Sequence, residues 1–434
     1  MAKLNLLFLF CLLFAACSSD DKDEQPILVT NVEMPAQGTV FNPGDKVTIS
    51  AKGFQADDEI MFNIRWPLAD QAIKEGYAMG VYGVVTELTA TKVTFLAPGH
   101  CPASTTEVLL CRSGEMMSLG KILVADGQSP EDFQLYAIIN SQYAPNTDYA
   151  IDHIKINQGS VEDVNRTITD QDFSCVVNLP GSGRLCGLLT KDNRRTVGIY
   201  DLSMNYWVEQ NTTSTDAMGT AADNSVLTAW QHADRLYINK VQTMPFSRMS
   251  MPEDPGFKMP AGLVAASLSR YPFIGTSDRY FLFSADNGDG TFSPVVLNGN
   301  ANKENCIHIG TPILADALIP FWIVKPVEGN ETTKYKRIGG YIVSKKPTFA
   351  GEDRTKLQLW NSETKTLEDP IVTFSNTACS VATLVSEDCK TQKLYILFDA
   401  HQNGKLIKVY DWLKKDWSPT NLSGFVHSEI VLAR

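Results

Sequence analysis

The segment VYDWLKKDW at residues 409–417 contains the clearest fold signal in the chain. A strand-like run ends in an aromatic residue and Asp411, and Trp417 follows six positions after the aspartate. The same pattern occurs as IYDLSMNYW at 199–207 and as LWNSETKTL at 359–367. An Asp or Asn at this place favours an Asx turn, and the large apolar residue beyond it anchors a returning strand. The sequence therefore predicts three hairpins built in the same way.

The region from residue 131 to 434 shows strand-like runs and no long amphipathic helix pattern. Further runs lie at 134–139, 174–178, 196–200, 235–239, 280–284, 321–324, 340–343 and 393–398. A recurring hairpin in a region of this size indicates a repeat fold. With about 40–50 residues in each four-stranded repeat, we expect six or seven repeats.

The aromatic-Asp…Trp pattern resembles one half of the blades of kelch-type β-propellers. Segments 337–341 and 393–398 resemble the blade strand that precedes it, and only the first keeps a Gly-Gly pair. The resemblance implies a β-propeller-like domain over residues 131–434. Further β-sandwich domains are the alternative interpretation, because the spacings between the motifs are irregular.

Residues 27–126 predict a separate β-sandwich of short strands bounded by turn residues. The expected strands are 47–51, 59–64, 92–96, 107–111 and 121–124. Pro35, the run Gly44–Ile49 and Gly53-Phe54 resemble the opening of immunoglobulin-like domains of the IPT/TIG type. We expect Gly44 to permit a tight turn and Gly53 to relieve the strand before Phe54 enters the core.

The first 16 residues predict a signal peptide, since Lys3 precedes an apolar run too short to span a bilayer. The stretch Leu13-Phe14-Ala15-Ala16-Cys17 resembles a bacterial lipobox. This resemblance implies cleavage before Cys17 and lipidation of its thiol. No later apolar run reaches transmembrane length, so we expect membrane attachment through the lipid anchor only.

Residues 17–26 form a lipidated, acidic stretch that we expect to be an extended tether. Its acidity beside the lipidated cysteine resembles the surface-export signal of Bacteroidetes lipoproteins. That implies a lipid-anchored protein of the outer membrane that faces the cell exterior. A periplasmic protein behind a solvated linker is the alternative.

Composition limits the class of partner. The 434 residues have a formal net charge of −11, with 20% charged and 44% hydrophobic residues. These fractions are typical of folded globular proteins. A net negative chain is poorly suited to bind nucleic acid or anionic lipid headgroups. We predict no nucleic-acid partner.

Six of the seven cysteines after Cys17 form close pairs in the sequence, and Cys306 stands alone. Separations of ten or eleven residues suit neighbouring strands, and an exported protein can keep disulfides. Buried thiols are the equal alternative. The candidate disulfides are Cys101/Cys111, Cys175/Cys186 and Cys379/Cys389.

The segment SADNGDGTF at 284–292 resembles the Asp-box of propeller hairpins, but it has one residue too many. It also fails the EF-hand pattern, because Gly288 and Gly290 stand where ligand oxygens are needed. We predict a plain hairpin between strands 280–284 and 292–297. Scattered histidines and the absence of zinc-ligand spacing predict no metal site and no cofactor.

No nucleophile elbow, zinc helix or phosphate-binding glycine loop is present in the sequence. We therefore predict no catalytic residues and favour non-catalytic recognition, with a glycan as ligand and a polysaccharide uptake complex as partner. A glycan site needs an exposed aromatic side chain with amides around it. Trp66 and Trp230 are the candidates. A polysaccharide-degrading hydrolase or lyase, and a protein-binding scaffold or adhesin, are the alternatives.

Overall fold

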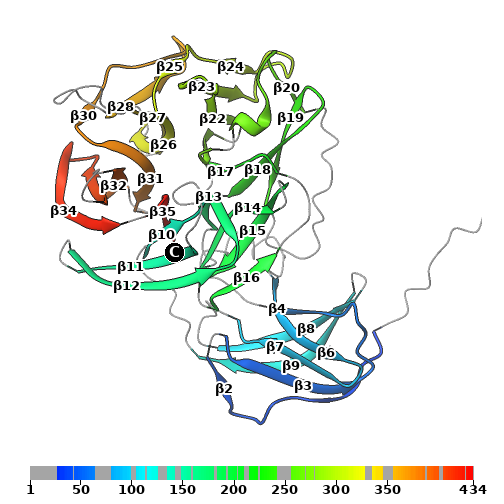
Figure 1. Ribbon diagram of the computed structural model, residues 1–434. Helices are drawn as coiled ribbons and strands as arrows, with labels where there is room; N and C mark the ends of the chain where they lie inside the picture. Colours follow the sequence, from blue (N-terminus) through cyan, green and yellow to red (C-terminus); the bar gives the residue numbers. More distant parts are fainter. Residues whose placement is uncertain are drawn as a thin grey trace, which may run out of the picture.

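Strands make up the regular structure of the described residues, apart from one 3-10 turn at Ala265–Leu268 (η2). They form two all-β domains, a sandwich of two sheets and a ring of sheets (Figure 1). Within this part of the chain, no helix has the length and apolar character needed to cross a bilayer. The computed structural model describes residues 27–42, 44–63, 80–98, 104–112, 115–125, 134–141, 148–157, 160–179, 183–191, 194–202, 204–209, 215–222, 225–241, 256–268, 270–277, 279–327, 335–345, 355–386, 389–399, 404–425 and 427–433.

The first domain is the predicted immunoglobulin-like sandwich. One sheet has the order β1-β3-β7-β6, with bounds Thr30–Glu33, Lys46–Lys52, Lys92–Leu96 and Val85–Thr89. The other has the order β2-β9-β8-β4-β5, with bounds Val40–Phe41, Glu115–Val124, Ser104–Arg112, Glu59–Asn63 and Gly80–Tyr82. Alternate residues of β3 are buried, as a strand with one face on a core requires. Phe62 of β4 contacts Phe95 of β7 with ring centroids 5.6 Å apart, which joins the two sheets.

Two glycines of this domain behave as the sequence predicts. Gly44 has a φ of +84° in the turn before β3. Gly53 has a φ of +102°, and a Cβ there would lie 2.4 Å from the carbonyl oxygen of Leu28. Arg112 also donates to the Gly53 carbonyl at 2.8 Å and forms an ion pair with buried Asp58. Gly53 is therefore needed both for its conformation and for the close approach of the chain.

The second domain consists of antiparallel units of four or five strands that follow one another along the chain. The first has the order β12-β11-β10-β35 (Ser160–Thr169, Tyr149–Asn157, Gln134–Ile139, Glu429–Ala433), and the second is β13 to β16 (Asp172–Leu179, Arg184–Lys191, Arg194–Asp201, Tyr206–Glu209). A nine-stranded sheet holds the next two, β17 to β20 (Ala217–Thr220, Val226–His232, Arg235–Lys240, Phe257–Lys258) and β21 to β25 (Phe273–Ser277, Tyr280–Asp286, Thr291–Asn298, Ile307–Ile309, Ile313–Leu314). The last two are β26 to β30 (Ala317–Pro326, Tyr335–Ser344, Thr355–Asn361, Thr366–Leu367, Val372–Phe374) and β31 to β34 (Thr377–Val385, Gln392–Asp399, Lys405–Asp411, Asp416–Phe425).

The units close into a ring through their innermost strands. Neighbouring contacts run from β35 to β13, β17, β21, β26, β31 and back to β35. The C-terminal strand β35 pairs with β10, so the two ends of the domain share one sheet (Figure 1). This closure gives every innermost strand two neighbours, as in propeller-type folds.

Hydrophobic clusters fill the spaces between successive units. One cluster joins the β10 sheet to the β13 unit, and the next joins the β13 unit to the β17 unit. A third lies between the β17 and β21 units, and the largest extends from the β21 unit through the β26 unit to the β31 unit. A last cluster returns from the β31 unit to the β10 sheet. Stability of this domain therefore depends on face-to-face packing of neighbouring sheets.

The three predicted hairpins are confirmed, and they share their backbone geometry. The motif aspartate or asparagine accepts backbone N–H groups two or three residues ahead. The aromatic before it pairs across the ladder with the predicted apolar residue. Four residues after the Asx side chain, Asn205, Lys365 and Lys415 each have a φ of 51–57°. The repeated sequence therefore folds into the same turn in three units.

The hairpin predicted near residues 284–292 is also confirmed. Strands β22 and β23 pair from Tyr280↔Asn298 to Asp286↔Phe292. Asp289 closes the turn by accepting the N–H and the hydroxyl of Thr291 at 2.9 and 2.6 Å. Gly288 and Gly290 both have positive φ, which L-residues adopt at a cost.

Candidate functional site

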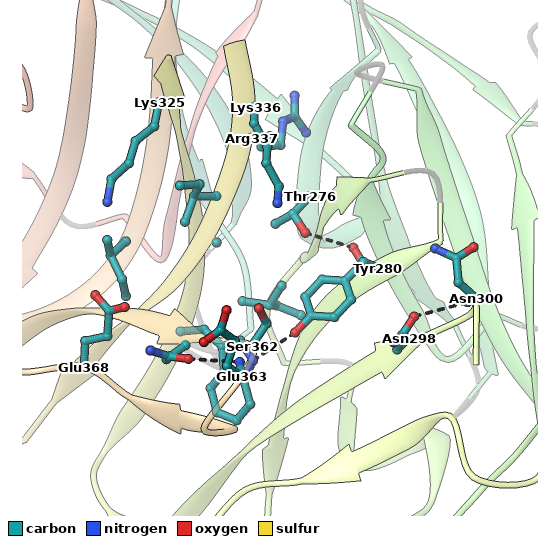
Figure 2. A pocket seen from close by; sticks show the side chains of 16 residues that line it. Thr276, Tyr280, Asn298, Asn300, Lys325, Lys336, Arg337, Ser362, Glu363 and Glu368 are labelled. Atoms are coloured by element: carbon teal, nitrogen blue, oxygen red, sulfur yellow. Dashed lines mark hydrogen bonds between the residues drawn. The ribbon is translucent and has the colours of Figure 1, made fainter. Parts of the chain in front are cut away.

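A pocket of about 610 Å³ lies between the β21 unit and the β26 unit. It is built where β21, β23, β26 and β28 end and where β22 and β27 begin (Figure 2). Its volume lies within the range of small-molecule sites. We call it the inter-unit pocket, and its lining residues are Thr276, Tyr280, Leu282, Asn298, Asn300, Lys325, Lys336, Arg337, Ile338, Gly339, Leu359, Trp360, Asn361, Ser362, Glu363 and Glu368.

Close packing of two strands forms the floor of the pocket. A Cβ at Gly339 would lie 2.6 Å from a methyl carbon of Leu282 and 3.0 Å from one of Thr276. The Gly-Gly pair noted in the sequence is thus explained, since only glycine lets β27 approach β22 so closely. Buried Trp360 donates its indole N–H to the hydroxyl of half-buried Tyr280 at 3.0 Å. Burial raises the pKa of Tyr280, which stays protonated at neutral pH.

Arg337 lines the pocket, but its guanidinium contacts backbone carbonyl groups of the protein itself. Its guanidinium donates to the carbonyl oxygens of Ala221 and Gly275 at 2.6 and 3.2 Å. It also lies 3.6 Å from the centre of the Trp322 ring. The side chain is buried, and its contacts tie β27 to β21 and to the segment after β17. Its charge therefore stabilises the junction between units.

The exposed wall of the pocket has charged and amide side chains. Lys325 is the next-to-last residue of β26 and Lys336 the second residue of β27, and the two are directly opposite in the ladder. In Figure 2 the Lys336 side chain extends toward Thr276 and Tyr280, and the Lys325 side chain extends toward the side of the pocket where Glu368 lies. Exposed Glu363 and Glu368 also line the pocket, Asn298 is the last residue of β23, and Asn300 lies two residues beyond it. Such a wall can bind hydroxyl and anionic groups on one ligand.

A second group of polar side chains lies at the closing strand. We define the closure cluster as Asn140, Asp152, Arg166, His427 and Glu429. The Glu429 carboxylate accepts the backbone N–H groups of Cys175 and Val176 at 3.0 and 2.9 Å, and the Asn140 amide at 3.0 Å. Burial raises the pKa of Glu429 to about 7, although these three donors act in the opposite direction. The carboxylate joins the closing strand β35 to β13.

Asp152 forms the other half of the closure cluster. Its carboxylate is 2.7 Å from the His427 ring nitrogen Nε2 and 2.8 Å from the Arg166 guanidinium. Burial acts to raise the pKa of Asp152, but these partners outweigh it and the pKa lies below its ordinary value. Asp152 and His427 are 0% and 2% exposed, so a substrate cannot reach this pair. We assign it to closure of the ring.

Trp230, one of the two tryptophans predicted as ligand platforms, does not line the inter-unit pocket. Trp230 on β18 is half-buried and stacks on Tyr237 of β19, with ring centroids 4.7 Å apart and planes at 19°. Tyr237 covers one face of its ring, and His232 lies 6.0 Å away. The prediction at Trp66 and the lipidation prediction at Cys17 lie outside the described residues.

The structure corrects two of the three disulfide predictions, Cys175/Cys186 and Cys379/Cys389. Cys379 lies near the start of β31 and Cys389 in the turn beyond its end, roughly 20 Å apart along the strand. A disulfide needs Cα atoms within about 7 Å, so this bridge was predicted wrongly. The separation of ten residues predicted that Cys379 and Cys389 lie on neighbouring strands. In the structure β31 extends from Thr377 to Val385, so most of those ten residues belong to one strand.

Cys175 and Cys186 lie on neighbouring strands, and the structure holds them as thiols in one hydrophobic cluster. An irregularity in the β13–β14 ladder falls at Cys175, and Val177 is the residue opposite Cys186. Because of this irregularity, Cys175 is not the residue opposite Cys186 in the ladder. Cys111 and Cys306 are also buried thiols, and Cys101 lies outside the described residues.

Sequence reasoning missed the inter-unit pocket. Tyr280 and Trp360 stood within predicted strands and motifs, but nothing local places them beside each other, 80 residues apart. Lys325 and Lys336 belong to a hairpin whose register no sequence pattern reveals. Among the described residues, no group of three His, Cys, Asp or Glu side chains could hold a metal ion.

The fold defines a class of protein, an immunoglobulin-like domain followed by a propeller-type domain. Residues 26–132 match the DUF4784 N-terminal Ig-like domain, and residues 135–433 match the DUF4784 WD40-like domain. The chain belongs to the DUF4784 family. The family assigns the second domain to the WD40-like type, where the sequence alone had resembled the kelch type.

One solved structure of the same family agrees with this assignment. A DUF4784 family protein from Bacteroides caccae is 26% identical, with a TM-score of 0.66 over 94% of this chain and 100% of that one. TolB from Acinetobacter baumannii is 11% identical, with a TM-score of 0.41 over 81% of this chain and 82% of that one. No curated protein matches the sequence.

Proposed function

We propose that the protein is a lipid-anchored outer-membrane protein, facing the cell exterior, that recognises glycans without catalysis as an accessory to polysaccharide uptake. The observation that supports recognition is the inter-unit pocket, where Tyr280 lies among amide and charged side chains. An aromatic ring packs against the apolar face of a sugar, and amides bind its hydroxyl groups. The lipobox-like stretch that ends at Cys17 and the acidic residues after it support the location.

The pocket has the features of a binding site on a rigid support. Its side chains come from the ends of paired strands in two units, and the Arg337 contacts fix those units to each other. Asn298 is itself oriented, because its side-chain oxygen accepts the N–H of Asn300 at 3.2 Å. A pre-formed site loses little conformational entropy when a ligand binds.

Binding on a glycan array, combined with a reducing-sugar assay on the purified full chain, tests this function. We expect glycan binding that Tyr280→Ala weakens by about tenfold or more, because one aromatic contact is lost. Asn300→Ala is a second pocket variant at an exposed position, and it should weaken binding without disturbing the fold. Tyr206→Ala is the control, since Tyr206 is an exposed tyrosine on β16 outside the pocket.

Each outcome separates the proposal from its rivals. Release of reducing sugar from a polysaccharide would show a degrading enzyme. Silence of the whole array would exclude glycan recognition and favour a protein-binding scaffold. An equal loss of glycan binding in Tyr206→Ala and Tyr280→Ala would show that the inter-unit pocket is not the glycan site.

The location has its own test. Cys17→Ala should abolish incorporation of labelled fatty acid and leave the signal peptide uncleaved by the lipoprotein peptidase. Unchanged labelling and processing of this variant would contradict the lipid anchor.

A further inference from the structure

Two lysines face each other across one ladder at the inter-unit pocket. Lys325 of β26 and Lys336 of β27 are register partners in an antiparallel pair, and both are exposed. Like charges directly opposite in a sheet repel and destabilise it. A lysine at either position is therefore not explained by the stability of the hairpin.

Among the described residues, no carboxylate forms an ion pair with either lysine. In the described part of the chain, no hydrogen bond or ion pair involves the ammonium group of Lys325 or Lys336. Some basic residues elsewhere in the domain are paired, since Arg270 pairs with Asp286 at 3.0 Å and Arg235 with Glu304 at 2.6 Å. The pocket thus has two positive charges available to a ligand.

The remaining lining groups limit what that ligand is. Glu363 and Glu368 can accept hydrogen bonds from hydroxyl groups, and the Asn298 and Asn300 amides can donate and accept. Tyr280 adds an aromatic surface. A neutral sugar would use all of these groups, but it has no strong partner for two ammonium groups.

We propose that the inter-unit pocket takes an acidic saccharide, and that Lys325 and Lys336 bind its anionic groups. This inference rests on the proposed glycan recognition and adds the charge class of the ligand. A sugar carboxylate and a sulfate ester share the chemistry that matters, an anion with several oxygen acceptors. Each ammonium group can donate to the oxygens of either anion, and an acidic oligosaccharide has an anionic group on more than one sugar.

Titration calorimetry on the full chain tests the inference with three matched probes. These are oligogalacturonate, a sulfated galactan oligosaccharide and a neutral galactan oligosaccharide of the same length. We expect an acidic probe to bind at least about tenfold more tightly than the neutral one. Its affinity should fall as salt rises, because exposed charges are screened. Preference between the two acidic probes identifies carboxylate or sulfate as the recognised group.

Lysine variants test whether Lys325 and Lys336 cause the preference for the acidic probe. Lys325→Thr and Lys336→Thr should each weaken binding of the acidic probe by about tenfold and leave the neutral probe unchanged. Lys356→Thr is the matched control, because Lys356 is an exposed lysine on β28 that does not line the pocket.

The outcomes distinguish the two proposals. Equal affinity for acidic and neutral probes, or full binding by both lysine variants, would overturn the inference and leave glycan recognition standing. Failure of all three probes, together with a silent glycan array, would overturn glycan recognition itself.

Discussion

Charged side chains serve different purposes in the closure cluster and in the inter-unit pocket. In the closure cluster, Glu429 accepts three N–H groups and Asp152 contacts both His427 and Arg166. Lys325 and Lys336 are exposed and form no such contact with another described residue. A buried charge needs a partner to offset its desolvation cost. An exposed charge stays solvated and can pair with a ligand instead. One domain thus uses buried, paired charge to close its ring and leaves two lysines exposed at its pocket.

Removing a carboxylate from each region gives the largest expected contrast. Glu429→Ala should lower the free energy of unfolding by about 3–5 kcal/mol, because it leaves three buried N–H groups without an acceptor. Glu363→Ala, at an exposed position of the pocket, should change it by less than about 0.5 kcal/mol. Urea unfolding of both variants measures the difference. Similar losses in the two variants would show that the closure cluster has no special role in stability.

The pH dependence of stability provides a smaller test of the closure cluster. Burial raises the pKa of Glu429 from 4.5 to about 7, so the folded protein holds this proton more tightly than the unfolded chain does. The stabilising contribution is full below pH 4.5 and is lost as the pH rises to about 7, by an amount on the order of 3 kcal/mol.

Glu429→Gln isolates this effect, because glutamine does not titrate. The difference in unfolding free energy between the wild-type protein and this variant should change across pH 4.5–7 and stay constant above about pH 8. Histidines titrate in both proteins and cancel from the difference. A constant difference over the whole range would show that the folded and unfolded states bind this proton equally.

The smallest expected effect on stability belongs to the pocket. Lys336→Thr removes a like-charge contact with Lys325 and should leave the free energy of unfolding unchanged or raise it by less than about 0.5 kcal/mol. Thermal unfolding at low salt measures this change. A clear loss of stability would mean that the Lys336 side chain supports the hairpin, and would weaken its assignment to a ligand.

Local sequence predicted the hairpins of the second domain because their geometry is local. The side chains of Asp201, Asn361 and Asp411 each cap their own turn, and no distant contact is needed to form it. The cysteine pairs show the limit of such reasoning. Cys379 and Cys389 are close in sequence, but the extended strand between them carries them apart.

The sequence by itself determined the all-β class, the strands, the repeated Asx hairpins and the glycines of the first domain, since these follow from neighbouring residues. Only the tertiary structure decided how the ring closes through β35, which residues form the closure cluster and where a pocket opens. These features join residues as far apart as Asn140 and Glu429. Contacts between such residues depend on how whole sheets pack, and no local pattern in the sequence records that packing.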